Sequence, residues 1–253
     1  MAACPPSARP LVLLHGFTGT PSSWRRVLAA LPPEQPRVVP CLLGHDGTDG
    51  ARGATSFEQE VDRLAGQVAA QTSGRVHLAG YSLGARVALG LLVRHRELFD
   101  AATLLGVHPG LETEGERKER QALDWEWQRI LRDEPLEVFC ERWEAQPIFA
   151  SQRRLDPAAL AEQRRLRLSH HRAGLGRALA VLGLGAMPCY RKSLPLLDLP
   201  LRLVVGELDA KFTALGRSMV TSLPRADLFI VSGAGHNVLL EQPDVVARLL
   251  RFG

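Results

Sequence analysis

A serine lies at the centre of the pentapeptide GYSLG at residues 80–84. The apolar run VHLAG before it is typical of a buried strand, and LGARVALGLL after it has helical spacing. The two flanking glycines permit a sharp strand-to-helix turn that larger side chains would crowd. The pattern therefore predicts a nucleophile elbow with the Ser82 hydroxyl at its tip.

A reactive serine needs a base, and the base needs an orienting carboxylate, in the chain order Ser, Asp, His. Asp209 follows the strand-like run LRLVVG, and His236 follows DLFIV. Both therefore lie just past strand ends, where they can converge on Ser82. Glu207 is the alternative acid, but Asp209 lies further into the loop and is preferred. The alternative for His236, a surface histidine, is disfavoured by its position between a strand and a helix.

An oxyanion site requires two backbone N–H donors, one after the nucleophile and one from an early strand-end loop. Leu83 provides the first donor. The loop HGFTG directly follows the run LVLL, so the N–H of Phe17 is the expected second donor. His15 in the same loop is expected to be a structural turn residue.

Arg86 lies four residues after Ser82, on the same face of the expected helix. This helix is otherwise apolar, and the positively polarised start of a helix disfavours a buried arginine unless an anion is supplied. One interpretation is an ion pair with a carboxylate of the protein. We favour the other, in which Arg86 binds a carboxylate of the substrate.

Short apolar runs bounded by Gly and Pro recur along the chain with helical segments between them, which predicts an α/β fold with a mostly parallel sheet covered on both faces. The expected strands are 11–14, 37–40, 76–80, 102–106, 201–206 and 227–231. The expected helices of the core are 20–31, 56–71, 83–95 and 243–252.

The stretch 110–195 has helical patterns and no convincing strand, so we expect a helical cap inserted between strands, over the strand ends where ligands bind. Residues 1–109 and 196–253 then form the core, and the whole chain is one structural unit. The cap is rich in basic residues, most of which should be solvated. If two turn inward beside Arg86, the pocket suits a small polycarboxylate. The candidates are Arg117, Lys118, Arg120, Arg153, Arg154, Arg164, Arg165, Arg167 and Arg172.

Composition narrows the class of protein. The 253 residues carry a formal charge of +4 with both signs interspersed, which does not indicate a nucleic-acid partner. The chain shows no signal-like leader and no long uninterrupted apolar run, so we expect a soluble, cytoplasmic protein without membrane insertion. The four cysteines are widely scattered, which favours reduced thiols and no metal site. A monomer is favoured.

Several segments together resemble a known family, the 2-succinyl-6-hydroxy-2,4-cyclohexadiene-1-carboxylate (SHCHC) synthases of menaquinone (vitamin K2) biosynthesis, which have the α/β-hydrolase fold. The resemblance covers nearly the whole chain. Its specific evidence is Arg86 within GARVA, the run from HPGL to ERQ, and QPIFAS, because the other motifs occur throughout the superfamily. The matching segments are HGFTGTPSSW, GYSLGARVALGLL, GVHPGLETEGERKERQ, QPIFAS, GELDAKF and GAGHN.

The resemblance implies a lyase with no metal or organic cofactor. It would eliminate pyruvate from 2-succinyl-5-enolpyruvyl-6-hydroxy-3-cyclohexene-1-carboxylate by proton abstraction with a catalytic triad. Arg165 is the alternative for the third arginine. The residues implied are the triad Ser82, Asp209 and His236, the substrate-binding Arg86, Arg120 and Arg167, and the pocket residues Tyr81 and Trp143. One departure is LLGHDGT at 42–48, where Asp46 replaces a glycine of the family pattern.

Two other functions compete with this one. A carboxylesterase or thioesterase acting on an anionic substrate has the same fold and triad. A non-catalytic ligand-binding member of the superfamily is disfavoured, because a receptor does not need all three triad residues.

Overall fold

A single parallel sheet forms the centre of the molecule. The structure is a computed structural model that describes residues 9–251, and its six strands lie in the order β2-β1-β3-β4-β5-β6, all parallel within this part of the chain. The strands are β1 (Leu11–Leu14), β2 (Arg37–Val38), β3 (Val76–Tyr81), β4 (Phe99–Leu105), β5 (Leu201–Gly206) and β6 (Ala226–Val231). The six predicted strands are confirmed, with β2 shorter than expected and β4 beginning three residues earlier.

Alternate side chains of the strands pack on opposite faces of the sheet, as the two-residue period of a strand requires. In β1, Val12 and Leu14 belong to one hydrophobic cluster, and Leu11 and Leu13 belong to the other. The first cluster includes residues of α2 (Phe57–Gln71), α3 (Leu83–Arg94) and α8 (Ala210–Val220). The second includes residues of α1 (Arg25–Ala29), α9 (Val238–Glu241) and α10 (Pro243–Leu249). Helices therefore cover both faces of the sheet, and α8 and α9 are additions to the helices expected from the sequence.

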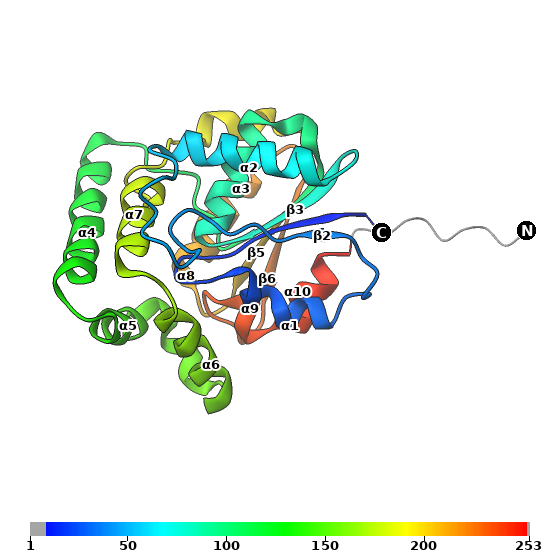
Figure 1. Cartoon of the computed structure of the whole chain (residues 1–253). Helices are drawn as coiled ribbons and strands as arrows, with labels where there is room; N and C mark the ends of the chain where they lie inside the picture. Colours follow the sequence, from blue (N-terminus) through cyan, green and yellow to red (C-terminus); the bar gives the residue numbers. More distant parts are fainter. Residues whose placement is uncertain (1–8, 252–253) are drawn as a thin grey trace, which may run out of the picture.

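The segment between β4 and β5 contains the cap helices. They are α4 (Glu114–Asp133), α5 (Leu136–Glu144), the 3-10 helix η3 (Pro147–Arg154), α6 (Pro157–Leu168) and α7 (Arg172–Leu182). Figure 1 shows α4 to α7 grouped on one side of the sheet. They enclose a small core of their own, in which Leu131, Phe139 and Leu175 are buried.

The end of this segment returns to the main core. Met187, Tyr190 and Leu194 are buried in the same cluster as Phe57 of α2. The division of the chain into a core and a cap at residues 110 and 195 remains a prediction.

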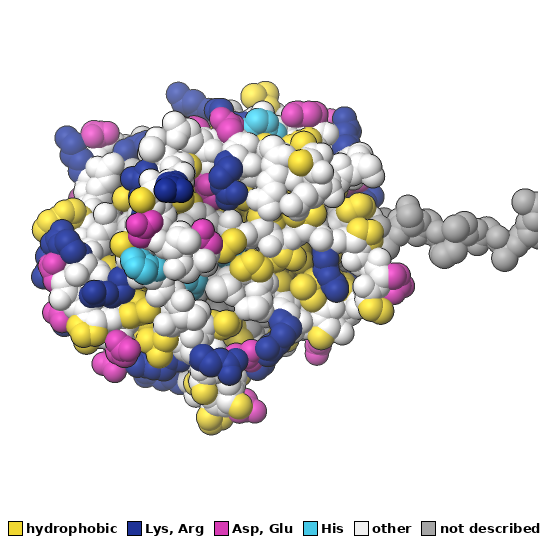
Figure 2. Space-filling view, viewed as in Figure 1, with side chains coloured by type: hydrophobic (Ala, Val, Ile, Leu, Met, Phe, Trp, Pro, Cys, Tyr) yellow, Lys and Arg dark blue, Asp and Glu magenta, His cyan; other side chains and the backbone are white. Residues whose placement is uncertain are grey.

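Charge is dispersed over the surface. Figure 2 shows Lys and Arg side chains scattered among Asp and Glu on the face viewed. Cys41, Cys140 and Cys189 are free thiols, and Cys4 lies outside the described residues. No helix within residues 9–251 is long and apolar enough to cross a membrane.

Candidate active site

Ser82 lies at a tight turn between β3 and α3. Its backbone has φ 52° and ψ −106°, a conformation that L residues rarely adopt. The turn depends on its two glycines: a Cβ on Gly80 would lie 2.4 Å from the carbonyl oxygen of Gly84, and a Cβ on Gly84 would lie 2.3 Å from that of Leu14. Neither position accommodates a side chain. The local structure thus has the geometry of the predicted elbow.

Three side chains from separate strand ends form one hydrogen-bonded chain. His236 Nε2 lies 3.0 Å from Ser82 Oγ, and His236 Nδ1 lies 2.7 Å from Asp209 Oδ2. The carboxylate can only accept, so His236 carries a proton on Nδ1 and presents Nε2 to the serine hydroxyl. Asp209 also caps α8, because its Oδ1 accepts a hydrogen bond from the amide of Phe212 at 3.1 Å. This arrangement can accept a proton through Ser82.

Glu207 does not contact His236. Its Oε2 accepts hydrogen bonds from the hydroxyl of Ser232 at 2.9 Å and the amide of Gly233 at 2.8 Å. These bonds hold the pKa of the Glu207 carboxyl below its ordinary value. Of the two acids considered from the sequence, only Asp209 lies within reach of the imidazole.

The two predicted oxyanion donors border the same space. Leu83 is the first residue of α3, and amides in the first turn of a helix have no carbonyl partner within that helix. Phe17 lies after β1 and lines both pockets that open on Ser82. His15 is fully buried, its Nε2 accepts the amide of Leu42, and burial lowers its pKa to about 4, which agrees with a structural turn residue.

Two pockets meet at Ser82 and share Phe17, Trp143 and Phe149 in their walls. We name them by their arginines. The Arg86 pocket is lined by Arg86, Arg120, His108, Lys211 and Gln146 among others. The Arg167 pocket is lined by Arg167, Tyr81, Arg25, Arg26 and Glu162 among others. All five predicted substrate-binding residues therefore line one or both of these pockets beside the serine.

Arg86 has no ion-pair partner among residues 9–251. Its Nη1 donates a hydrogen bond to the carbonyl of Leu182 at 2.7 Å, while the nearby carboxylate of Asp124 binds Arg120 at 2.9 Å. Burial and, to a lesser extent, the positive charge of Arg120 lower the pKa of Arg86 to about 9, against a smaller opposing effect of Asp124. An anion in the pocket would relieve this electrostatic cost.

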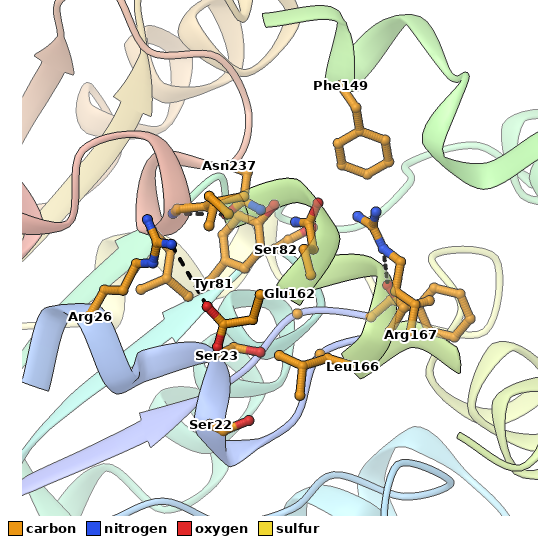
Figure 3. Close-up of a pocket in the computed structure, with 18 of the residues that line it drawn as sticks. Ser22, Ser23, Arg26, Tyr81, Ser82, Phe149, Glu162, Leu166, Arg167 and Asn237 are labelled. Carbon is orange, nitrogen blue, oxygen red and sulfur yellow. Dashed lines mark hydrogen bonds and ion pairs between the residues drawn. The ribbon is translucent and has the colours of Figure 1, made fainter. Parts of the chain in front are cut away.

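Arg167 faces the site from the cap, and Arg165 does not. Only 4% of Arg167 is exposed, and its Nη1 donates to Glu144 Oε1 at 2.9 Å. Figure 3 shows Arg167 and Phe149 of the cap opposite Ser82 and Tyr81 of the core. Arg165 is exposed and lines neither pocket.

Most of the other basic cap residues are solvated or bound elsewhere. Arg164 pairs with Glu144, and Arg117 donates to the carbonyl oxygens of Met187 and Leu111. Lys118, Arg153, Arg154 and Arg172 are exposed. Of the nine, Arg120 and Arg167 line a pocket that opens on Ser82.

Sequence reasoning did not single out several residues of the Arg86 pocket. His108 follows β4, its Nδ1 accepts the amide of Gly110, and burial together with the charges of Arg86 and Lys211 lowers its pKa to about 4. It is therefore neutral near pH 7. Lys211 lies two residues after Asp209, and this position past a strand end was the signal that could have indicated it.

Trp143 belongs to an aromatic cluster at the junction of the two pockets. Its ring centroid lies 5.0 Å from those of Phe17 and Trp127 and 5.7 Å from that of Phe139.

Asp46, the departure in the loop 42–48, accepts hydrogen bonds from the amide and hydroxyl of Thr48. Within the described part of the chain, no group of three or more His, Cys, Asp or Glu residues could hold a metal ion.

Comparison with known proteins defines the class first. Residues 11–249 match the Alpha/beta hydrolase family, and the chain belongs to this family. The solved structure of MenH from S. aureus superposes with a TM-score of 0.90 at 25% identity, over 96% of this chain and 91% of the other. A thermophilic esterase from Thermogutta terrifontis, with malate bound, superposes with a TM-score of 0.81 at 25% identity, over 97% and 89%.

Curated relatives define the narrower group. A putative 2-succinyl-6-hydroxy-2,4-cyclohexadiene-1-carboxylate synthase of Bacillus subtilis (strain 168) is 34% identical over 97% of this chain and 90% of its own length. The synthase of that name from Enterobacter sp. (strain 638) is 34% identical over 95% and 89%. Within the α/β hydrolases, the chain belongs to the family of these synthases.

Proposed function

We propose that the protein is a 2-succinyl-6-hydroxy-2,4-cyclohexadiene-1-carboxylate synthase, a lyase of menaquinone biosynthesis. It eliminates pyruvate from 2-succinyl-5-enolpyruvyl-6-hydroxy-3-cyclohexene-1-carboxylate. The observation that carries the proposal is Arg86, a half-buried guanidinium beside Ser82 without a carboxylate partner in the described chain. An enzyme for neutral esters has no use for such a charge, whereas a substrate carboxylate satisfies it.

The substrate bears three carboxylates, and five arginines border the two pockets that meet at Ser82. Two of them, Arg25 and Arg26, pair with Glu162, which leaves three as candidates for the substrate. Arg86 and Arg120 border one pocket, and Arg167 borders the other. A guanidinium binds a carboxylate through two parallel hydrogen bonds, which positions it as well as attracting it. The spacing of the arginines around Ser82 therefore supports a polycarboxylate whose reacting carbon lies between its anionic groups.

Proton abstraction begins the reaction. His236 Nε2 accepts the hydroxyl proton of Ser82 as Ser82 Oγ removes the proton on the ring carbon next to the succinyl ketone. The electron pair of this C–H bond moves toward the ketone and forms an enolate. Asp209 holds His236 in the required tautomer and stabilises its positive charge.

Elimination completes the reaction. The amides of Phe17 and Leu83 donate hydrogen bonds to the enolate oxygen, where negative charge develops. The enolate electrons then form a ring double bond between C2 and C3, and the existing C3–C4 double bond shifts to C4–C5. The C5–O bond breaks, and pyruvate leaves with its electron pair as its enolate, which takes up a proton. No covalent acyl-enzyme and no cofactor are required.

A coupled assay tests the proposal. The enolpyruvyl substrate is generated in situ by the enzyme of the preceding step, and pyruvate is followed with lactate dehydrogenase and NADH. We expect pyruvate formation that depends on this protein and is lost in Ser82→Ala. Turnover of p-nitrophenyl esters at rates typical of esterases, with no pyruvate released from the enolpyruvyl substrate, would instead identify a carboxylesterase.

A further inference from the structure

Thr18 has an unusual backbone conformation directly after the proposed oxyanion donor Phe17. Its φ is +60°, a region that β-branched residues rarely occupy, and it is 4% exposed. Such a conformation persists only where surrounding contacts hold it. The Phe17 amide lies in the peptide plane that Phe17 shares with Gly16, and the next plane holds the Phe17 carbonyl and the Thr18 amide. Contacts that fix Thr18 therefore restrict the Phe17 amide through the backbone at the Cα of Phe17.

One contact comes from the core. The amide of Thr18 donates a hydrogen bond to Nε2 of His45 at 3.2 Å, and Nδ1 of His45 lies 2.9 Å from the carbonyl of Leu43. An amide only donates and a carbonyl only accepts, so His45 is neutral, with its proton on Nδ1. The loop 42–48 thus holds the N-terminal side of Thr18.

The other contacts come from the cap. Nε2 of His170 donates to the carbonyl of Thr18 at 3.1 Å, and Nε of Arg167 donates to the hydroxyl of Thr18 at 3.4 Å. Arg167 lies in the last turn of α6, and His170 follows two residues after the end of this helix and is 7% exposed. The ring of His170 also packs edge-on against that of His45, with centroids 5.3 Å apart. The cap therefore holds the C-terminal side of Thr18.

The side chain of Phe17 is part of the same junction. Its ring packs edge-on against Trp143 at 5.0 Å and against Phe139 at 6.3 Å, within the small core of the cap. Phe17 lines both pockets beside the reactive serine, and its ring packs against cap residues. The loop after β1 is thus held by the cap at two successive residues.

We propose that His170 is a positioning residue that holds the Phe17 amide in the oxyanion hole through its hydrogen bond to the Thr18 carbonyl. The inference rests on the proposed function, since the hole serves the enolate of that reaction. On this proposal, the oxyanion hole is complete only when the cap packs against the loop after β1. Arg167, which binds a substrate carboxylate, contacts the same threonine, so carboxylate binding and oxyanion stabilisation are linked at Thr18.

Two substitutions separate the hydrogen bond from the packing. His170→Leu fills the space with a side chain of similar length but removes the Nε2–H donor. His170→Gln places an amide N–H near the position of the imidazole Nε2. An oxyanion donor acts in the transition state and not in the ground state, so its displacement lowers kcat and leaves KM unchanged. We expect kcat of His170→Leu to fall by about 10- to 100-fold with KM within about threefold. His170→Gln should recover kcat to within about threefold of wild type.

His171 provides the matched control, because it is the neighbouring histidine, is exposed and makes no side-chain hydrogen bond at the start of α7. His171→Leu should leave kcat and KM unchanged. A fall in kcat in His170→Gln equal to that in His170→Leu would overturn the proposal. A rise in KM at constant kcat in His170→Leu would also overturn it.

A second readout does not depend on the lyase reaction. A fluorophosphonate labels a reactive serine, and its phosphoryl oxygen occupies the oxyanion hole during labelling. We expect Ser82 to be labelled at least about tenfold more slowly in His170→Leu than in wild type. If wild type forms no pyruvate, the proposed function fails, and the labelling rates still decide the role of His170. Equal labelling rates overturn that role.

Folding is followed by thermal melting of each variant. If His170→Leu is unfolded, His170→Met takes its place, because the unbranched thioether fits irregular space without a donor. Should both variants prove unfolded while His170→Gln is folded and fully active, His170→Leu is combined with Thr18→Gly, since glycine adopts positive φ without the contact. A double variant with the kcat and labelling rate of Thr18→Gly alone would show that the hole needs no support from His170.

Discussion

Arg86 donates a hydrogen bond of 2.7 Å from Nη1 to the backbone carbonyl of Leu182, at the C-terminal end of α7. A charged side chain of core helix α3 is thereby fixed against the cap, with the remaining guanidinium donors in the Arg86 pocket. A neutral carbonyl orients the guanidinium without cancelling its charge. The charge therefore remains available to an anionic substrate.

The first prediction concerns this charge. Arg86→Ala should lose a charge-assisted contact worth about 2 to 4 kcal/mol, so that kcat/KM falls by about 30- to 1000-fold. Arg86→Lys should recover only part of the loss, because a point charge does not reproduce the planar fork. The melting temperature of Arg86→Ala should be equal to or above that of wild type, because the substitution removes a half-buried charge that has no carboxylate partner among residues 9–251.

The control for Arg86 is Arg94 on the same helix, which pairs at the surface with Asp62 at 2.8 Å. Arg94→Ala should leave kcat/KM within about threefold of wild type. A lowered melting temperature with normal kinetics in Arg86→Ala would show that the residue has a structural role instead.

The second prediction concerns the proposed base. Ser82→Ala and His236→Ala should each lower kcat by at least about a thousandfold, because the three residues act as a unit and the loss of one disables proton abstraction. Both variants should remain folded in thermal melts. Retention of more than about a tenth of wild-type activity in folded Ser82→Ala protein would exclude the serine as the proton acceptor.

The third prediction separates the two candidate acids. Asp209→Asn should lower kcat by about a hundredfold or more, because an amide in place of the carboxylate favours the wrong imidazole tautomer. Glu207→Gln should change kcat by less than about threefold, since Glu207 contacts Ser232 and Gly233 and not His236. Steady-state kinetics on the two purified variants provide the comparison, and the reverse order of effects would assign the acid to Glu207.

The fourth prediction separates two arginines of α6. Arg167→Ala should lower kcat/KM by about 30-fold or more through loss of a carboxylate contact in the Arg167 pocket. Arg165→Ala should have little effect, because Arg165 is exposed and lines neither pocket. Equal losses in the two variants would argue for a general electrostatic effect of α6, which a rise in salt concentration would abolish.

The fifth prediction concerns stability in acid. Burial lowers the pKa of His15 to about 4, whereas the unfolded residue titrates near 6.5. Between these pH values the unfolded chain binds a proton that the folded chain does not. The free energy of unfolding therefore falls as pH is lowered from about 6.5 to about 4. For each such residue the fall is up to about 1.4 kcal/mol per pH unit. Burial lowers the pKa of His77 to about 3, so His77 contributes with the same sign.

Urea unfolding at several pH values measures this slope. His15→Asn should have a shallower slope of unfolding free energy against pH than wild type, even if its stability at pH 7 is lower. His171→Gln should retain the wild-type slope, because His171 is exposed. A His15→Asn slope as steep as that of wild type would mean that His15 takes up its proton in the folded state near pH 6.5.

Local physical chemistry made part of this protein predictable from its sequence. The elbow around Ser82 follows from the close backbone contacts at Gly80 and Gly84, which are properties of one short turn. The strands follow from short apolar runs, and parallel strands end at one edge of the sheet, so Asp209 and His236 were expected near Ser82. Their catalytic roles remain predictions, although the hydrogen-bond distances agree with them.

Only the tertiary structure decided which charges face the site. The cap has nine Arg and Lys residues on helical segments, and the sequence does not distinguish among them. Helix packing brings Arg120 and Arg167 to the pockets and leaves most of the others in solvent or bound to other groups. The contact between His170 and Thr18 joins residues 152 positions apart, which no local pattern encodes. The direction of a side chain depends on how whole helices dock, and that is set by the sum of many burial and packing contacts across the chain.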